Sequence, residues 1–219
     1  MTHHIERQIE HLKERILRVG TLVEEAISKS ITALINRDTQ LAQRVMASDE
    51  EIDRMEVEVE EECLKILALY QPVAADLRFV VSVLKINNDL ERMGDLARNI
   101  AKRVAQLTAG EPCELPPEIR TMAMQAQDMV KECLDAVVKG DPLLAQQVRE
   151  EDDAVDEARQ KIRRRIIQQI KENPDNVESL LRINSVSKHI ERSADMATNI
   201  AEDVIYMVQG DIVRHRSNE

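Results

Sequence analysis

Two acidic residues four positions apart, followed by an asparagine four positions later, occur in the chain as Glu91, Asp95 and Asn99. On an α-helix, residues with this spacing lie above one another on one face. The three side chains would therefore form a column of oxygen-bearing groups that can bind a cation. Two carboxylates at this spacing repel each other, so we expect a positive charge to compensate them. The same column returns one hundred residues later as Glu191, Asp195 and Asn199.

These columns belong to a longer internal repeat. Residues 90–104 and 190–204 are identical at eight of fifteen positions, whereas chance predicts about one identity. An earlier segment repeats at an offset of 103 and preserves two further acid pairs with the same spacing. These further pairs are Asp49 with Asp53 and Asp152 with Asp156. We therefore interpret the chain as a duplication of one unit that carries two acid pairs.

The composition predicts an all-α fold. Aromatic residues make up 1% of the chain, five of the 219 residues are glycine and 32% are charged, which is typical of long helices. Prolines, glycines and capping residues divide each half into three helical segments. The predicted helices span residues 2–35, 38–70, 72–109, 117–139, 143–172 and 176–209. We expect two tandem three-helix bundles, formed by residues 1–110 and 111–219.

The charge and the cysteines narrow the functional class. A net charge of −11 argues against a nucleic-acid-binding protein, which needs clustered Lys and Arg. The three cysteines lack CxxC spacing, and we interpret them as reduced thiols of a cytosolic protein. The sequence has neither an apolar run of about 18 residues nor a secretory signal, so we expect a cytoplasmic location without membrane spans.

The two acid pairs of one half are predicted to lie at the same height. Asp49 and Asp53 centre 20 residues before the turn near residue 71, and Glu91 and Asp95 centre 22 residues after it. With a rise of about 1.5 Å per residue, both pairs lie roughly 30–33 Å from that turn. The apolar seam of the third helix lies opposite its acids, so we expect the carboxylates on the outer surface or in a groove between helices. The seam consists of Phe79, Ile86, Met93, Ile100 and Leu107.

The donor types define the chemistry of such a site. Carboxylates without histidine or cysteine favour Mg, Ca, Mn or Fe over a structural zinc site. A di-iron oxidase would need Glu-x-x-His motifs, which the sequence lacks. Neither a nucleophile–base set nor a phosphate-binding loop is visible, so we expect no enzymatic activity. Two other interpretations stay open, a metal-storage protein or metal-dependent enzyme that uses the acids, and a structural helical adaptor whose acids are solvated.

The repeated Glu-Arg-x-x-Asp-x-x-x-Asn-Ile-Ala pattern and the Gln-Pro-Val-Ala-Ala-Asp-Leu-Arg run at residues 71–78 resemble the PhoU family of phosphate-specific transport regulators. The resemblance implies a PhoU-like fold, multinuclear metal clusters and a homodimer. It also implies a cytoplasmic negative regulator of the phosphate-starvation response, acting between the PstSCAB phosphate transporter at the membrane and the PhoR sensor histidine kinase. The related phosphate-permease accessory family is an alternative that the double pattern disfavours.

The resemblance also assigns metal ligands. The metal expected first is iron, with magnesium, manganese or zinc as alternatives. The first cluster would use Asp49, Asp53, Glu91 and Asp95, and the second would use Asp152, Asp156, Glu191 and Asp195. Asn99 and Asn199 would be further donors or weak ligands. The halves are expected to differ, because His189 replaces Asp89 and residues 71–78 have no full counterpart.

Arginines and one short motif are further candidates for partner contacts. Arg92 and Arg192 follow the acids in sequence but lie about 100° around the helix, and we expect them in interhelical ion pairs or at a partner surface. Residues 76–78, Asp-Leu-Arg, lie in the first turn of a predicted helix. Either Asp76 is an acid that the helix dipole favours at this position, or the three residues form a docking motif for a partner.

Overall fold

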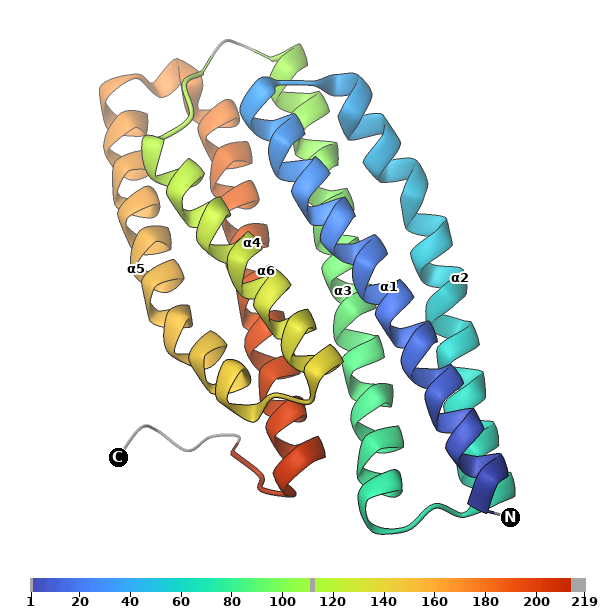
Figure 1. Cartoon of the computed structure of the whole chain (residues 1–219). Helices are drawn as coiled ribbons and strands as arrows, with labels where there is room; N and C mark the ends of the chain where they lie inside the picture. Colours follow the sequence, from blue (N-terminus) through green and yellow to red (C-terminus); the bar gives the residue numbers. More distant parts are fainter. Residues whose placement is uncertain (1, 111–112, 214–219) are drawn as a thin grey trace.

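The computed structural model describes residues 2–110 and 113–213 of the chain. Within these residues it contains six α-helices, a short 3-10 helix at Pro174–Asn176 and no β-strand. The helices are α1 (Thr2–Asn36), α2 (Thr39–Tyr70), α3 (Ala74–Ala109), α4 (Pro117–Lys139), α5 (Pro142–Glu172) and α6 (Val177–Gln209). The first three and the last three form two three-helix units (Figure 1). The predicted all-α class with two tandem bundles is confirmed.

Most helix ends lie within a residue or two of their predicted positions, and capping residues fix several of them. The Asp38 carboxylate accepts a hydrogen bond from the backbone N–H of Leu41 at 2.9 Å and thereby caps α2. The Asp141 carboxylate accepts from the N–H of Leu143 at 3.0 Å and caps α5 in the same way. Gly140 ends α4 with a φ of 58°, a left-handed conformation that glycine adopts readily.

The predicted start of the third helix at Pro72 is wrong. α3 begins at Ala74, because Gln71 has a left-handed backbone with φ 47° and Val73 is extended with φ −130°. These conformations reverse the chain between α2 and α3, which lie antiparallel. Pro72 therefore belongs to the connection, where its fixed φ and missing N–H are tolerated.

α3 and α6 pack against each other at the centre of the molecule and run in opposite directions (Figure 1). α1 and α4 also meet across the boundary between the two halves. Within the described residues, α2 packs only on α1 and α3, and α5 packs only on α4, α6 and the 3-10 helix. α2 and α5 therefore form opposite edges of the molecule.

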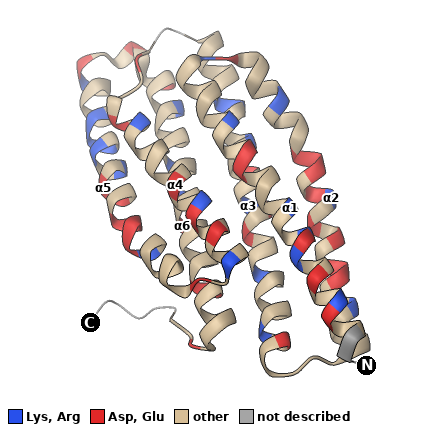
Figure 2. Ribbon diagram, viewed as in Figure 1, with Lys and Arg blue, Asp and Glu red and all other residues tan. Residues whose placement is uncertain are grey.

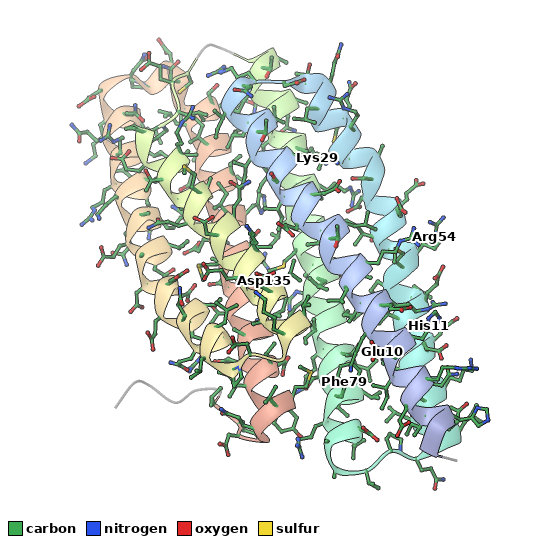
Figure 3. All side chains as sticks on the ribbon, in the orientation of Figure 1. Glu10, His11, Lys29, Arg54, Phe79 and Asp135 are labelled. Atoms are coloured by element: carbon green, nitrogen blue, oxygen red, sulfur yellow. The ribbon has the colours of Figure 1, made fainter. Side chains whose placement is uncertain are left out.

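The apolar seam of α3 brings α2 close at the level of the acid pairs. Ile86, Met93 and Ile100 are fully buried, as predicted, whereas Phe79 near the start of α3 is only partly buried (Figure 3). A Cβ atom on Gly94 would lie 3.2 Å from Cδ1 of the buried Ile52 on α2. Glycine at this position lets the two helices approach closely, and this approach positions the acids on either side of it.

The structure also bears on the expectations about membrane-spanning helices and about the cysteines. None of the helices in the described part of the chain is long and apolar enough to cross a membrane. Cys63, Cys113 and Cys133 are free and buried. Burial is the main cause that raises the pKa of the Cys63 thiol to about 12, so this thiol is protonated at neutral pH and acts as a packing residue.

Candidate metal centres

The first acid set gathers between α2 and α3. Asp49 and Asp53 come from α2, and Glu91 and Asp95 come from α3. Burial raises the pKa of the Glu91 carboxyl, and the negative charges of Asp95, Asp53, Glu56 and Asp49 raise it further. All four carboxylates predicted for the first cluster therefore lie within electrostatic reach of one another.

Arg98 supplies the positive charge that this set requires. Its Nη1 atom lies 3.2 Å from Asp49 Oδ2 and 3.3 Å from Asp95 Oδ1, so one guanidinium group links α2 and α3. Burial and the charge of Asp53 raise the pKa of Asp49, and Arg98 acts in the opposite direction. Arg98 was not predicted from the sequence as part of this set, although its place three residues after Asp95 on one helix is a known ion-pair spacing.

The prediction that the acids lie away from the core is wrong for Asp49. This residue is only 7% exposed, because the close approach of α2 and α3 beside Ile52 and Gly94 covers it. Asp53 is exposed, and both Glu91 and Asp95 are partly exposed. The first set therefore combines one buried carboxylate with three that solvent reaches.

The second acid set lies between α5 and α6. Burial is the main cause that raises the pKa of Asp152 to about 6, and the charges of Asp195 and Asp156 add to it. Burial also raises the pKa of Asp195, together with the charges of Glu191 and Asp156. Arg159 lies on the same helix as Asp152, and its Nε atom is 3.5 Å from Glu191 Oε2. The four carboxylates of the second set are thus also neighbours.

The two sets differ in how their charge is compensated. Thr198 stands at the position that Arg98 occupies in the first half. Asp152 consequently has no ion pair like that of Asp49, and its Oδ1 atom is buried without a hydrogen-bond partner among the described residues. The pairing of Arg159 with Glu191 leaves Asp152, Asp156 and Asp195 to repel one another. The one arginine paired within each set therefore lies in a different place, between Asp49 and Asp95 in the first set and beside Glu191 in the second.

The side chains in their present positions do not outline a single ion position. Among the described residues, no three acidic, histidine or cysteine side chains surround a common point at which a metal ion would fit. In the first set Arg98 occupies the space between Asp49 and Asp95. Like-charged carboxylates also avoid one another when no cation lies between them. Ion binding at either set therefore requires rotation of the carboxylates, and in the first set it also requires displacement of Arg98.

Asn99 lies at the boundary between the halves, and Asn199 contacts a residue that lines the same boundary. Asn99 lines a hollow of about 120 Å³ between α3 and α6, together with Arg92, Asp95 and Arg192. Asn199 lies on α6 with its Nδ2 atom 3.9 Å from Met196 Sδ, and Met196 lines the same hollow. The predicted role of both amides as further donors remains a prediction.

Arg92 and His189 of the motif segments each contact a residue of their own helix, Asp89 and Ser185 respectively. Arg92 Nη1 lies 3.7 Å from Asp89 Oδ1 on its own helix, so the expected interhelical ion pair is not formed there. His189 stands where the first half has Asp89 and is half-buried. Burial lowers the pKa of His189, and the positive charges of Arg103 and Arg192 lower it further.

Asp76 and Arg78 of the Asp-Leu-Arg motif at the start of α3 line a groove of about 650 Å³ at one end of the boundary between the halves. Phe79 and Glu10, which line this groove, lie near the N-terminal ends of α3 and α1 respectively (Figure 3). Lys139 of α4 and Met207 of α6 contribute the opposite wall. The groove therefore joins all four helices that meet at the boundary.

The chain matches the sequence profile described as PhoU domain twice, at residues 16–104 and 119–204. The two matches coincide with the two halves of the internal repeat. The chain belongs to the PhoU family. PhoU membership agrees with the resemblance drawn from the repeated acid motif and from residues 71–78.

Relatives of the PhoU family match along almost the whole chain. A phosphate-specific transport system accessory protein PhoU homolog of Aquifex aeolicus is 39% identical over 210 residues, which cover 96% of this chain and 95% of the relative. The homolog of Pseudomonas aeruginosa is 40% identical over 220 residues, covering 98% and 91%.

Two solved PhoU structures have the same arrangement of helices. The crystal structure of PhoU from Pseudomonas aeruginosa has a TM-score of 0.91 at 39% identity and covers 94% of this chain and 99% of that one. The phosphate transport system regulatory protein PhoU from Streptococcus pneumoniae has a TM-score of 0.89 at 29% identity and covers 95% and 99%.

Proposed function

We propose that this chain is a cytoplasmic accessory and regulatory protein of a phosphate transport system, without catalytic activity of its own. The double PhoU match and the names of relatives that align over more than nine-tenths of the chain support this role. In detail, the chain represses the phosphate-starvation response by linking a PstSCAB-type transporter to a PhoR-type sensor histidine kinase. It acts by contact with these partners, and its long helices provide the surfaces.

Cation binding at the acid sets is part of this proposal. The observation that carries it is Asp152, a partly buried carboxylate with a pKa raised to about 6 and one buried oxygen atom that has no hydrogen-bond partner among the described residues. A divalent or trivalent cation would relieve the repulsion among Asp152, Asp156 and Asp195, and only oxygen donors are offered. Iron is the first expectation, followed by magnesium, manganese and zinc.

The first acid set suggests how a bound cation would change the surface seen by a partner. Arg98 holds Asp49 and Asp95 together and is itself about half exposed. A cation at these carboxylates would displace the guanidinium group, because both positive charges cannot occupy one site. The released Arg98 side chain would then extend from the surface of α3 and become available to an acidic group of a partner.

Metal content tests the cation-binding part. We would purify the chain without an affinity tag or chelator and measure bound metals by elemental analysis. The wild type should retain metal, and a variant with Asp152→Asn and Asp195→Asn should lose the metal that is bound at the second acid set. Asp135→Asn on α4 is a matched control, because Asp135 pairs with Lys139 at 3.0 Å outside both sets (Figure 3). Equal metal content in all three proteins would exclude the second set as the site.

Gene expression tests the regulatory part separately. A strain that lacks its own copy of this protein should express phosphate-starvation genes in phosphate-rich medium, and the wild-type chain should restore repression. A metal-free chain that still restores repression would separate the regulatory role from the acid sets. Failure of the wild-type chain to restore repression would contradict the regulatory proposal itself. Turnover of phosphate esters by the metal-loaded chain would instead favour the alternative of a metal-dependent enzyme.

A further inference from the structure

The hollow of about 120 Å³ between α3 and α6 is lined by two arginines, one from each half of the duplication. Arg92 and Arg192 are equivalent residues, one hundred positions apart. Two guanidinium groups at one small hollow repel each other unless a negative charge compensates them. Neither arginine belongs to the acid sets proposed to bind cations. Their charge partners therefore decide what the hollow can bind.

The two arginines differ in their local charge partners. Arg92 Nη1 lies 3.7 Å from Asp89 Oδ1, so an acid of the same helix compensates its charge. The second half has His189 at the position of Asp89, and an imidazole ring offers no negative charge. Arg192 is exposed and forms no ion pair with any described residue, although its charge lowers the pKa of Asp195 from a longer distance. The duplication has therefore left one guanidinium group of the hollow without an acidic partner.

The donors and the size of the hollow suit a small oxyanion. A guanidinium group can donate two parallel hydrogen bonds to two oxygen atoms of one phosphate or sulfate ion. The side-chain amide of Asn99, which also lines the hollow, adds further N–H donors. Sites for drug-sized organic ligands have volumes of roughly 300–1,000 Å³. The hollow is smaller than these sites, so it has room for a small ion and a few water molecules.

Asp95 allows the hollow to distinguish between oxyanions. Its carboxylate is part of the lining and can only accept hydrogen bonds. Sulfate carries no proton at neutral pH, so this carboxylate would repel it. Inorganic phosphate retains at least one proton near neutral pH, and its O–H group can donate a hydrogen bond to Asp95. Arg98 lies 3.3 Å from Asp95 Oδ1 and offsets part of the remaining repulsion. The lining therefore favours phosphate over sulfate.

We propose that the hollow between α3 and α6 binds inorganic phosphate, with Arg192 as the main cationic donor. Arg92 and Asn99 would donate further hydrogen bonds to the ion, and Asp95 would accept one from it. Because these residues come from both halves of the duplication, a bound ion would link the halves at the centre of the molecule. The phosphate group of a lipid headgroup has the same chemistry, but the small volume favours the free ion.

The rest of the chain gives an anion no general attraction. The net charge is −11, and Figure 2 shows acidic residues along both edge helices, α2 and α5. Such a charge repels anions at long range. Binding of phosphate would therefore depend on the donors of the hollow itself, and single substitutions there should abolish most of it.

Titration of the metal-free chain with inorganic phosphate tests this site. Metals would be removed with a chelator, the chelator would be dialysed away, and the arginine Nε–H signals would be followed by nuclear magnetic resonance at constant ionic strength. The Arg192 signal should shift with a Kd of about 1 mM or lower. Sulfate should bind at least about tenfold more weakly, because it cannot donate a hydrogen bond to Asp95. Asp95→Asn should remove most of this difference.

Three substitutions locate the site. Arg192→Gln should weaken phosphate binding at least about tenfold, because it removes the unpaired guanidinium group. His189→Asp, which copies Asp89 of the first half, should also weaken binding, since the new carboxylate would pair with Arg192 and repel the anion. Arg164→Gln on α5 is the matched control and should leave binding unchanged. Arg164 is also exposed and without an ion pair to a described residue, but it does not line the hollow. Circular dichroism would check the fold of each variant.

Several outcomes would overturn the proposal. One is a wild type whose arginine signals do not shift at phosphate concentrations up to about 20 mM. Another is equal weakening by Arg192→Gln and Arg164→Gln, and a third is sulfate binding as tight as phosphate binding. Binding to phosphatidylglycerol vesicles that Arg192→Gln abolishes, without binding of free phosphate, would assign the donors to a lipid headgroup instead. Phosphate binding does not depend on the proposed regulatory contacts, so this titration and the gene-expression test can fail separately.

Discussion

Replacement of Asp152 by asparagine should stabilise the metal-free protein at neutral pH. The folded chain raises the pKa of this carboxyl from 3.8 to about 6, chiefly through burial, so the folded state retains the proton to a higher pH than the unfolded state does. Stability is therefore lost as the pH rises from about 4 to about 6, and the loss is complete above that range. Asparagine has a similar shape but no charge, and it avoids this loss.

The size of the effect follows from the same shift. A rise in pKa from 3.8 to about 6 corresponds to about 3 kcal/mol at neutral pH, if all of it were expressed. Asp152 is only partly buried, so solvent screens the charge and reduces the expected gain to about 1–2 kcal/mol. The gain should shrink to about a third at pH 4.5 and towards zero only near pH 3, where the wild-type carboxyl is protonated in both states.

Urea unfolding in the presence of a chelator, at pH 4.5 and pH 7.5, measures this difference. Asp135→Asn on α4 serves as the control and should change the free energy of unfolding by less than about 0.5 kcal/mol at both pH values. Added metal should reverse the order of the two proteins, because only the wild type keeps the Asp152 ligand. A metal-free Asp152→Asn variant that is equal to or less stable than the wild type at pH 7.5 would refute the reasoning.

Two further substitutions address the first acid set. Arg98→Thr, which copies Thr198 of the second half, should raise the metal affinity of the first set about tenfold, because no guanidinium group then competes for Asp49 and Asp95. Calorimetric titration in a background that carries Asp152→Asn and Asp195→Asn measures this affinity. An unchanged affinity would contradict the view that Arg98 competes with the metal ion. Gly94→Val should lower the free energy of unfolding by about 1–3 kcal/mol, since even a Cβ atom would lie 3.2 Å from Ile52. Adding Ile52→Ala should cost less than the sum of the two single effects, and strict additivity would show that the two residues do not press on each other.

The helices and the proximity of the acidic residues could be predicted from the sequence, because both depend on the periodic spacing of residues along a helix. Buried Ile86, Met93 and Ile100 follow the seven-residue seam, and Asp38 and Asp141 cap the helices that they precede. Such features depend on residues close together in the chain or at a constant helical spacing.

Features that depend on the distance between helices could not be predicted. The burial of Asp49 follows from how closely α2 approaches α3, and that distance depends on the contact between Gly94 and Ile52. The start of α3 at Ala74 rather than Pro72 depends on how the chain reverses between two helices already packed together. Arg98 was visible as a neighbour of Asp95, but its reach to Asp49 is a property of the packed pair of helices.

The duplication has kept the packing of the two halves and changed the charges around it. Arg98 neutralises part of the first acid set, whereas Thr198 leaves the second set without that charge. A cation entering the second set meets no competing guanidinium group between its aspartates, but one entering the first set must displace Arg98. If both sets bind the same ion, we expect the second to fill first, because Arg159 pairs with Glu191 and does not lie between the aspartates. The exposed surface of α3 would then change only when the first set is filled. Under the proposal that both acid sets bind cations, the second would hold its ion at lower concentrations than the first, although both sets have one origin.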